Sequence, residues 1–260
     1  MRDRLDAKSI LAAMGTLDDA PTVRVYDTID STNAEAKRLA AAGEGDNLVV
    51  AADTQTAGRG RRGRDFFSPR ETGVYLSVCF RVTKTLADTV RLTGAAAVAV
   101  TRVIERLTGE SVGIKWVNDI YLNGGKVCGI LAEGVSDIRT GRITHMVIGI
   151  GLNVSTEAFP DEVRDIAASL HSDISRNVFI GAIVSELLGF IRDPDPTAFL
   201  DEYRTHSIVL GRTVTFTRGE GTDVGVAEEI TADGGLMVRR SDGTRVVLNS
   251  GEITLRIAEK

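Results

Sequence analysis

The chain is poor in cysteine, which limits the chemistry it can host. Only two cysteines occur among 260 residues, Cys79 and Cys128, and each lies in an apolar segment (YLSVCFRV and KVCGILAE). Two cysteines so far apart form neither a zinc motif nor a redox pair. We therefore expect two buried thiols without a catalytic role.

Positive charge is not in surplus either. The chain has 31 Lys and Arg residues against 36 Asp and Glu residues, a formal net charge of -5. A general nucleic-acid binder normally carries a basic surplus, so we do not expect DNA as a partner. Any basic patch must be local, and its partner is expected to be a small anion.

Long apolar runs and a signal peptide are also lacking. The first residues, MRDRLDAKSI, are charged, and no run reaches the ~18 apolar residues that a membrane span needs. These features predict a cytoplasmic protein with no membrane partner. About 20 residues precede the first expected strand, too few for a DNA-reading helix-turn-helix domain.

Apolar periodicity predicts an alternation of strands and helices. Thr32 and Glu35 form a capping-box pair, Gly43 is expected to end that helix, and Asn123-Gly124 favours a hairpin turn. The expected strands cover residues 23–29, 47–53, 73–82, 112–122, 126–135 and 143–154, and the expected helices cover 4–15, 31–43, 86–108, 178–191 and 196–206.

The sequence pattern changes after residue 211. Short strand-like segments with turn signals between them follow to the end, over about 50 residues. This pattern is typical of a small antiparallel barrel, and we place the boundary near 207–211. The expected division is a short N-terminal segment (1–20), a larger domain (21–207) and the barrel (208–260).

An Arg/Gly loop, TAGRGRRGRDFFSP at residues 56–69, is the most unusual stretch. Gly58, Gly60 and Gly63 spell the dinucleotide-binding pattern, but Pro69 follows too soon for the helix that this pattern must open. A P-loop is excluded as well, because Arg64 stands where the P-loop lysine should be. The loop could be a solvated surface loop or an RNA-binding segment.

The chemistry of the Arg/Gly loop suits an anion. Glycines let backbone N–H groups approach a ligand closely, and guanidinium groups match carboxylates and phosphates. A glycine-rich loop is costly to order. We therefore interpret it as a lid that closes when an anion arrives and shields a reactive intermediate from water.

Five segments in register identify the chain as resembling the biotin protein ligases. They are DSTNAEAK (30–37), TQTAGRGRRGRDFFSP (54–69), IKWVND (114–119), GGKVCGILAE (124–133) and GIGLNV (149–154). The resemblance implies an α+β fold in which a mixed sheet is flanked by helices, as in class II tRNA synthetases, with a small SH3-like barrel after it. It also implies that biotin and magnesium-ATP react to biotinyl-5'-AMP, whose acyl group then passes to a lysine of a biotin carboxyl carrier protein.

The resemblance assigns one group of residues to biotin. Lys126 would bridge the biotin carboxylate and the α-phosphate, and Arg61 would retain the intermediate; both are therefore the expected catalytic residues. Ser31, Thr32 and Gln55 are hydroxyls and amides of the kind that a ureido ring requires. The full biotin-binding set is Ser31, Thr32, Asn33, Gln55, Gly58, Arg59, Gly60, Arg61 and Lys126.

A second group is assigned to the nucleotide. The expected ATP-binding residues are Arg64, Lys115, Trp116, Asn118 and Asn153, with Asp119 as a candidate Mg²⁺ ligand. Trp116 could instead belong to the core. Gly149 and Gly151 are expected to let the strand pass close to the nucleotide.

Two positions depart from the family pattern. Val117 replaces the usual proline of KWPND, and Phe66 stands where tryptophan is common. A phenylalanine can still stack on an adenine but lacks the indole N–H.

Phosphoryl and nucleotidyl transfer depend on positioning and charge stabilisation, so no Ser/His/Asp nucleophile is required. The three histidines, His145, His171 and His206, accordingly lie outside every motif.

Two functions other than biotin ligation remain compatible with the sequence. A lipoate-protein ligase has the same fold but no use for ureido-reading side chains, and an Arg/Gly nucleic-acid binder would bind with a steep salt dependence. The short N-terminal segment favours a ligase without a DNA-binding domain. A homodimer is left open, since family members can dimerise.

Overall fold

The computed structural model describes residues 3–82, 89–137, 139–218, 221–249 and 253–255. Among these residues, seven strands form one mixed sheet in the order β1-β2-β3-β7-β6-β5-β4. β1 and β2 are parallel and the other neighbours are antiparallel. The strands are β1 (Thr22–Tyr26), β2 (Leu48–Ala52), β3 (Gly73–Arg81), β4 (Gly113–Lys115), β5 (Asp119–Leu122), β6 (Gly125–Ser136) and β7 (Ile143–Asn153).

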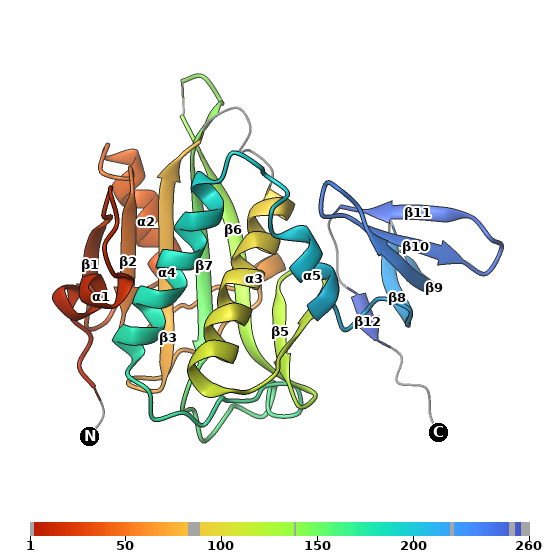
Figure 1. The fold of residues 1–260 in the computed structure, drawn as a ribbon, viewed down its shortest axis with the longest axis horizontal. Helices are drawn as coiled ribbons and strands as arrows, with labels where there is room; N and C mark the ends of the chain where they lie inside the picture. Colours follow the sequence, from red (N-terminus) through yellow and green to blue (C-terminus); the bar gives the residue numbers. More distant parts are fainter. Residues whose placement is uncertain (1–2, 83–88, 138, 219–220, 250–252, 256–260) are drawn as a thin grey trace.

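Helices cover both faces of this sheet, as Figure 1 shows. α1 (Ala7–Met14), α3 (Thr89–Thr108) and α4 (Arg176–Arg192) lie across one face, with α5 (Leu200–His206) beside α3. They bury the larger apolar core of the protein. α2 (Thr32–Ala41) lies on the opposite face, over a small second core that includes Leu48, Cys79 and Val147.

The N-terminal helix is part of the larger body rather than an appendage. Ile10 is fully buried and Met14 is 5% exposed. α1 packs on α4 at Gly181, where an added Cβ would lie 2.6 Å from the Ile10 carbonyl oxygen. A side chain at this position would separate the two helices.

The start of α2 differs from the expected capping box. Ser31 is the N-cap residue and makes no side-chain cap bond, and Thr32 is already helical. The Thr32 backbone N–H is instead satisfied by Gln55 Oε1 at 2.8 Å. Glu35 accepts from Tyr26 and Arg38 rather than from the backbone. The capping-box prediction was therefore wrong, because a side chain from another segment caps this helix.

The segment 112–122, expected as one strand, is two. β4 ends at Lys115 and β5 begins at Asp119, and the Trp116–Val117 peptide between them is cis. The next turn is as expected: Asn123 and Gly124 have φ values of 50° and 87°, the left-handed geometry that joins β5 to β6 tightly. The lysine that follows this hairpin, Lys126, is thereby placed next to the β4–β5 turn.

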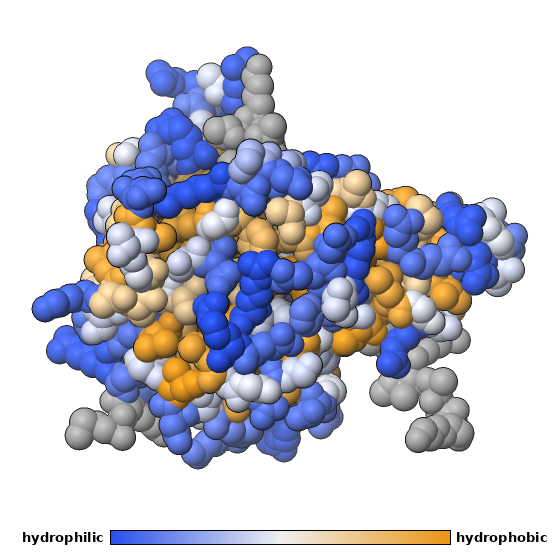
Figure 2. Space-filling view, viewed as in Figure 1, coloured by the Kyte–Doolittle hydropathy of each residue, from blue (hydrophilic) through white to orange (hydrophobic). Residues whose placement is uncertain are grey.

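A second, smaller sheet follows α5. Its described strands are β8 (Thr213–Arg218), β9 (Gly221–Ile230), β10 (Leu236–Arg240), β11 (Arg245–Leu248) and β12 (Ile253–Leu255), all antiparallel in the order β11-β10-β9-β8-β12. The expected small antiparallel unit is confirmed. It lies to the right of the larger body in Figure 1, and Figure 2 shows apolar residues where the two meet.

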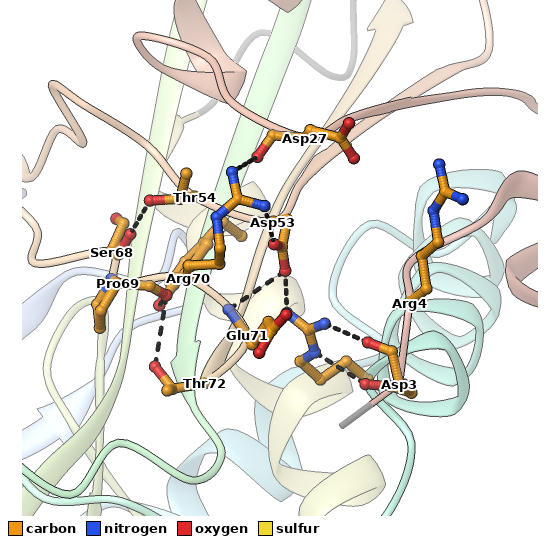
Figure 3. A network of polar contacts seen from close by, with 12 residues as sticks. Asp3, Arg4, Asp27, Asp53, Thr54, Ser68, Pro69, Arg70, Glu71 and Thr72 are labelled. Atoms are coloured by element: carbon orange, nitrogen blue, oxygen red, sulfur yellow. Dashed lines mark hydrogen bonds and ion pairs between the residues drawn. The ribbon is translucent and has the colours of Figure 1, made fainter. Parts of the chain in front are cut away.

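A buried ionic network ties the N-terminus to the base of the Arg/Gly loop. Arg176, at the start of α4, donates to Asp53 at 2.6 Å and to Asp3 at 3.0 Å. Asp53 also accepts from Arg70 and from the Glu71 backbone N–H. Figure 3 shows the Asp53 carboxylate, which precedes the loop, next to Arg70 and Glu71, which directly follow it. The loop therefore ends on a fixed point.

We expect Arg176→Ala to lower the free energy of unfolding by about 3 kcal/mol, because it leaves the buried Asp53 carboxylate without its closest cation. Urea denaturation measures the change. Arg164→Ala is the matched control: this arginine also pairs with an aspartate, but its side chain is 66% exposed. The control should change stability by less than ~1 kcal/mol. Equal losses of unfolding free energy in the two variants would show that the buried network stabilises the protein no more than an exposed ion pair does.

In the part of the chain that the structure describes, no helix has the length and apolarity that crossing a membrane requires.

Candidate active site

A cavity opens on the α2 face of the sheet, beneath the Arg/Gly loop. Its empty space is about 460 Å³, part of it open to solvent. The lining residues come from α2, the end of β2, the Arg/Gly loop, the β4–β5 turn and the strands β6 and β7: Ser31, Thr32, Asn33, Gln55, Arg59, Gly60, Arg61, Phe66, Asn118, Lys126, Gly129, Ile130, Leu131, Gly149, Ile150 and Gly151. Among the described residues that line the cavity, Arg59, Arg61 and Lys126 are cationic and none carries a carboxylate.

Glycines form the floor of the cavity. Gly129 on β6 pairs with Gly151 on β7, and Leu131 pairs with Gly149. A Cβ on Gly149 would lie 2.2 Å from Asn33 Oδ1, and one on Gly151 would lie 2.4 Å from the Phe66 ring. The missing side chains thus let α2 and the loop rest directly on the sheet. The two β7 glycines were expected to admit a nucleotide; in this structure they admit protein side chains.

One end of the cavity offers uncharged hydrogen-bonding groups. Ser31 and Thr32 stand at the N-terminus of α2, and both are almost fully buried. Gln55 Oε1 accepts from the Thr32 backbone and lies 3.2 Å from the Thr32 hydroxyl. Gln55 Nε2 donates to Ser68 at 2.9 Å. The amide orientation is thereby fixed, and the second N–H of Gln55 is left for other partners.

Asn33 is held in place by residues that the sequence did not single out. Its Nδ2 donates to Glu133 at 2.8 Å, and its Oδ1 lies 2.6 Å from the hydroxyl of the fully buried Ser77. The same hydroxyl lies 2.8 Å from Thr32 Oγ1. A serine inside the apolar strand GVYLSVCFRV was the available signal, since a buried hydroxyl needs partners.

The Arg/Gly loop folds back on itself over the cavity. Phe66 N–H donates to the Gly58 carbonyl at 2.9 Å, and Gly60 N–H donates to the Arg64 carbonyl at 2.7 Å. The only helical feature described here is the short 3₁₀ turn Arg61–Gly63, so the helix required by a dinucleotide fingerprint does not follow. Arg61 Nη1 reaches across the cavity to Asn118 Oδ1 at 3.0 Å.

Gly58 serves the packing of the loop rather than the cavity wall. A Cβ there would lie 2.4 Å from the Phe66 carbonyl oxygen and 2.7 Å from Ser68 Oγ. Gly58 does not line this cavity, and its expected ligand contact stays a prediction.

Lys126 owes its position to an irregularity in β6. Ile120 pairs with Cys128 but Tyr121 pairs with Lys126, so the register shifts by one residue here. The Lys126 backbone also bonds a different segment: its N–H donates to the Ile166 carbonyl at 2.7 Å, and its carbonyl accepts from Ala168 at 2.8 Å. Bulges of this kind re-aim a side chain.

The Lys126 ammonium group points along the cavity floor. It forms an ion pair with Asp119 at 2.7 Å. A Cβ on Gly129 would lie 3.2 Å from Nζ. Asn33 donates to the Leu131 carbonyl, two residues beyond Gly129 on β6. The cationic end at Gly129 and the uncharged end at Leu131 are therefore about 7 Å apart along the strand.

Four residues that were expected to contact the nucleotide do not line this cavity, and their nucleotide contacts stay predictions. Trp116 is 3% exposed, and its indole N–H donates to the Gly234 carbonyl in the smaller sheet, so the structure describes its core role. Asn153 Nδ2 donates to the Ala168 carbonyl at 3.0 Å and holds the segment beside Lys126. Lys115 Nζ lies 5.4 Å from the Tyr121 ring centre. With Arg64, these residues are outside the cavity lining, whereas Asn118 belongs to it.

Phe66, the phenylalanine that stands where tryptophan is common in the family, is part of the cavity. It lines the cavity, with its ring over Gly151 and 6.5 Å from the Tyr75 ring in an edge-to-face arrangement. The aromatic ring is thus part of the cavity wall. Its position on the glycine floor depends on strand pairing, which local sequence does not reveal.

Metal binding finds little support from side chains alone. Among the described residues, no three His, Cys, Asp or Glu side chains gather into a group that could hold a metal ion. Asp119 is occupied by Lys126 and by Asn118 Nδ2. A single carboxylate with a neighbouring amide still suits Mg²⁺ that arrives on a nucleotide, because such ions keep water and phosphate ligands.

Both thiols are buried, as expected. Burial raises the pKa of Cys79 to about 12, with a smaller contribution from the charge of Asp46. Burial also raises the pKa of Cys128, and it outweighs the opposing charge of Lys126. A raised pKa and burial both disfavour the thiolate form, and neither cysteine lines the cavity.

We therefore expect the native chain to resist alkylation by iodoacetamide at about pH 8, because a raised pKa removes the nucleophilic thiolate and burial blocks access. Mass spectrometry should find two modified cysteines only after denaturation in guanidinium chloride. Rapid labelling of the native chain at either cysteine would contradict the buried assignment.

Matches to family models and to relatives show the class of protein to which the chain belongs. Residues 25–153 match the model of the biotin/lipoate A/B protein ligase family, and residues 209–256 match that of the biotin protein ligase C-terminal domain. The Biotin--[acetyl-CoA-carboxylase] ligase of Mycobacterium tuberculosis is 35% identical over 237 residues, which cover 86% of this chain and 85% of that protein. The bifunctional ligase/repressor BirA of Bacillus subtilis is 32% identical over 240 residues, covering 86% and 71%.

A solved structure agrees with these relatives. The biotin protein ligase from Aquifex aeolicus in complex with biotin and ATP superposes with a TM-score of 0.75 at 27% identity, covering 90% of this chain and 98% of that one. Within the class of biotin and lipoate ligases, the chain belongs to the biotin protein ligase family.

Proposed function

We propose that this protein is an ATP-dependent ligase that activates biotin to biotinyl-5'-AMP and transfers the biotinyl group to a lysine of a biotin carboxyl carrier protein. One observation carries the proposal: a single cavity joins an uncharged, amide- and hydroxyl-lined end to a cationic end. Biotin has this division of chemistry, with a ureido ring at one end and a carboxylate at the other.

The uncharged end suits the ureido ring. Ser31, Thr32 and Gln55 present hydroxyls, an amide and a helix N-terminus, which can meet two ring N–H groups and one carbonyl. Because Ser31 and Thr32 are buried and the half-buried Gln55 is held by Thr32 and Ser68, a ligand without matching groups would leave these side chains unsatisfied. This cost favours biotin over lipoate, whose ring has no such groups.

The cationic end suits adenylation. A biotin carboxylate must attack the α-phosphate of ATP with loss of pyrophosphate, and two anions repel each other as they approach. Lys126, Arg59 and Arg61 converge there without a lining carboxylate, so positive charge can stabilise the transition state. The Lys126–Asp119 pair holds the ammonium group until substrate oxygens replace the aspartate.

The remaining assignments follow from this geometry. Arg61, bonded to Asn118 across the cavity, would retain the adenylate, and the Arg/Gly loop would exclude water. Asp119 and Asn118 would hold the Mg²⁺ that ATP carries, and that ion would offset triphosphate charge. We assign adenylation to residues 21–207 and the small C-terminal domain to residues 208–260.

The distinguishing experiment offers the purified chain biotin or lipoate with magnesium-ATP. We expect pyrophosphate release and a biotinyl-adenylate with biotin, and at least about 100-fold less with lipoate, because buried polar groups penalise a ligand that cannot pair with them. If the protein formed an adenylate with lipoate but not with biotin, it would be the alternative, a lipoate-protein ligase.

Lys126→Ala should reduce adenylate formation by about 10²–10³-fold, because it removes the charge nearest the attacking carboxylate. Single-turnover assays with radiolabelled ATP measure the rate. Lys8→Ala, at an exposed site on α1, is the control and should match the unmodified protein. Near-normal adenylation by a folded Lys126→Ala protein would overturn the assignment.

A further inference from the structure

The β4–β5 turn, Trp116–Asn118, faces the cavity on one side. Asn118 Oδ1 accepts from Arg61 Nη1 at 3.0 Å, and Asn118 Nδ2 donates to Asp119 at 2.9 Å and to the Ile130 carbonyl at 3.1 Å. The Asn118 carbonyl accepts from the Ile130 N–H at 2.9 Å. This one residue therefore connects the loop arginine, the partner of Lys126 and the cavity floor.

The other side of the turn contacts the smaller sheet. Trp116 Nε1 donates to the Gly234 carbonyl at 3.0 Å, and both residues are buried. Gly234 lies in the tight turn Thr231–Gly235 between β9 and β10, closed by the bond from the Thr231 N–H to the Gly235 carbonyl. Its φ of 77° requires glycine. Loss of the indole donor would leave a buried carbonyl without its partner.

Helix α5 supports the same turn from a second direction. The buried Tyr203 hydroxyl donates to the Val117 carbonyl at 3.2 Å. Burial raises the pKa of Tyr203, and the charges of Asp119 and Arg61 both act on it, in opposite directions.

We propose that Trp116 and Tyr203 are positioning residues. Trp116 bonds the β4–β5 turn to Gly234 of the smaller sheet, and Tyr203 of α5 bonds the same turn at Val117. Together they set the place of Asn118, and through it the place of Arg61, so that the smaller sheet and α5 control how firmly the loop retains the adenylate. This inference rests on the proposed biotin adenylation. It concerns residues that touch neither biotin nor the reacting atoms.

A matched control exists on the same turn of the smaller sheet. Asp233 forms an ion pair with Arg91 of α3, and the Asp233 side chain is 72% exposed. This pair ties the turn Thr231–Gly235 to the larger body without contacting the β4–β5 turn. Asp233→Ala therefore tests whether loss of a contact between the two sheets, made away from the β4–β5 turn, changes adenylate release.

The test compares Trp116→Phe, which keeps an aromatic ring and removes the N–H donor, with Asp233→Ala. We expect Trp116→Phe to release biotinyl-AMP about tenfold faster, while the KM for biotin stays within about twofold because the uncharged end lies away from the turn. Asp233→Ala should behave as the unmodified protein. Gel filtration of preformed radiolabelled adenylate complex gives the release rate.

A double-variant cycle separates positioning from general destabilisation. Arg61→Gly should also speed release, and adding Trp116→Phe to it should produce no further increase, since both changes break the same connection. Additive effects, equal leakage from Asp233→Ala, or unchanged release in Trp116→Phe would each overturn the inference.

A second variant and a measurement on the unmodified protein distinguish the remaining outcomes. If Trp116→Phe does not fold, Tyr203→Phe, which removes only a hydroxyl, takes its place with the same expectations. Failure of the proposed function would appear differently, as absence of biotinyl-AMP in the unmodified protein. A normal adenylate with unchanged release in both variants would reject the inference alone.

Discussion

The active site depends on a strip of sheet that carries no side chains. At Gly129, Gly149 and Gly151 the backbone of β6 and β7 is bare, so α2 and the Arg/Gly loop approach to within van der Waals distance. A single added methyl group at Gly149 would meet the Asn33 amide at 2.2 Å. The shape of the cavity, and the close placement of its uncharged and cationic ends, follow from this constraint.

Charge in the site is controlled by short-range pairing. Asp119 holds Lys126, and Asn118 holds Arg61, so two cations are kept in the cavity of an acidic protein. Asn118 lies in the β4–β5 turn and Asp119 directly follows it; this turn is bonded to Gly234 through Trp116 and to Tyr203 through Val117. The local basic patch thus depends on residues contributed by four separate segments of the chain.

Local signals predicted much of the fold. The Asn123-Gly124 hairpin, the antiparallel strands after Gly211 and the long helix ending at Thr108 all follow from periodicity or turn chemistry, which act within a few residues. The predictions that failed involve partners distant in sequence. Thr32 was expected to cap its own helix, but Gln55, 23 residues away, supplies the acceptor.

The sequence by itself determined the residue types of the site, because an Arg/Gly loop, a lysine after a tight hairpin and a polar helix start can be recognised from their neighbours alone. Only the tertiary structure decided which of them share a cavity. It showed that Trp116 and Asn153 bond other segments of the protein, and it revealed Ser77 and Glu133 behind Asn33. Strand register sets these contacts, and register is a property of pairing between distant segments.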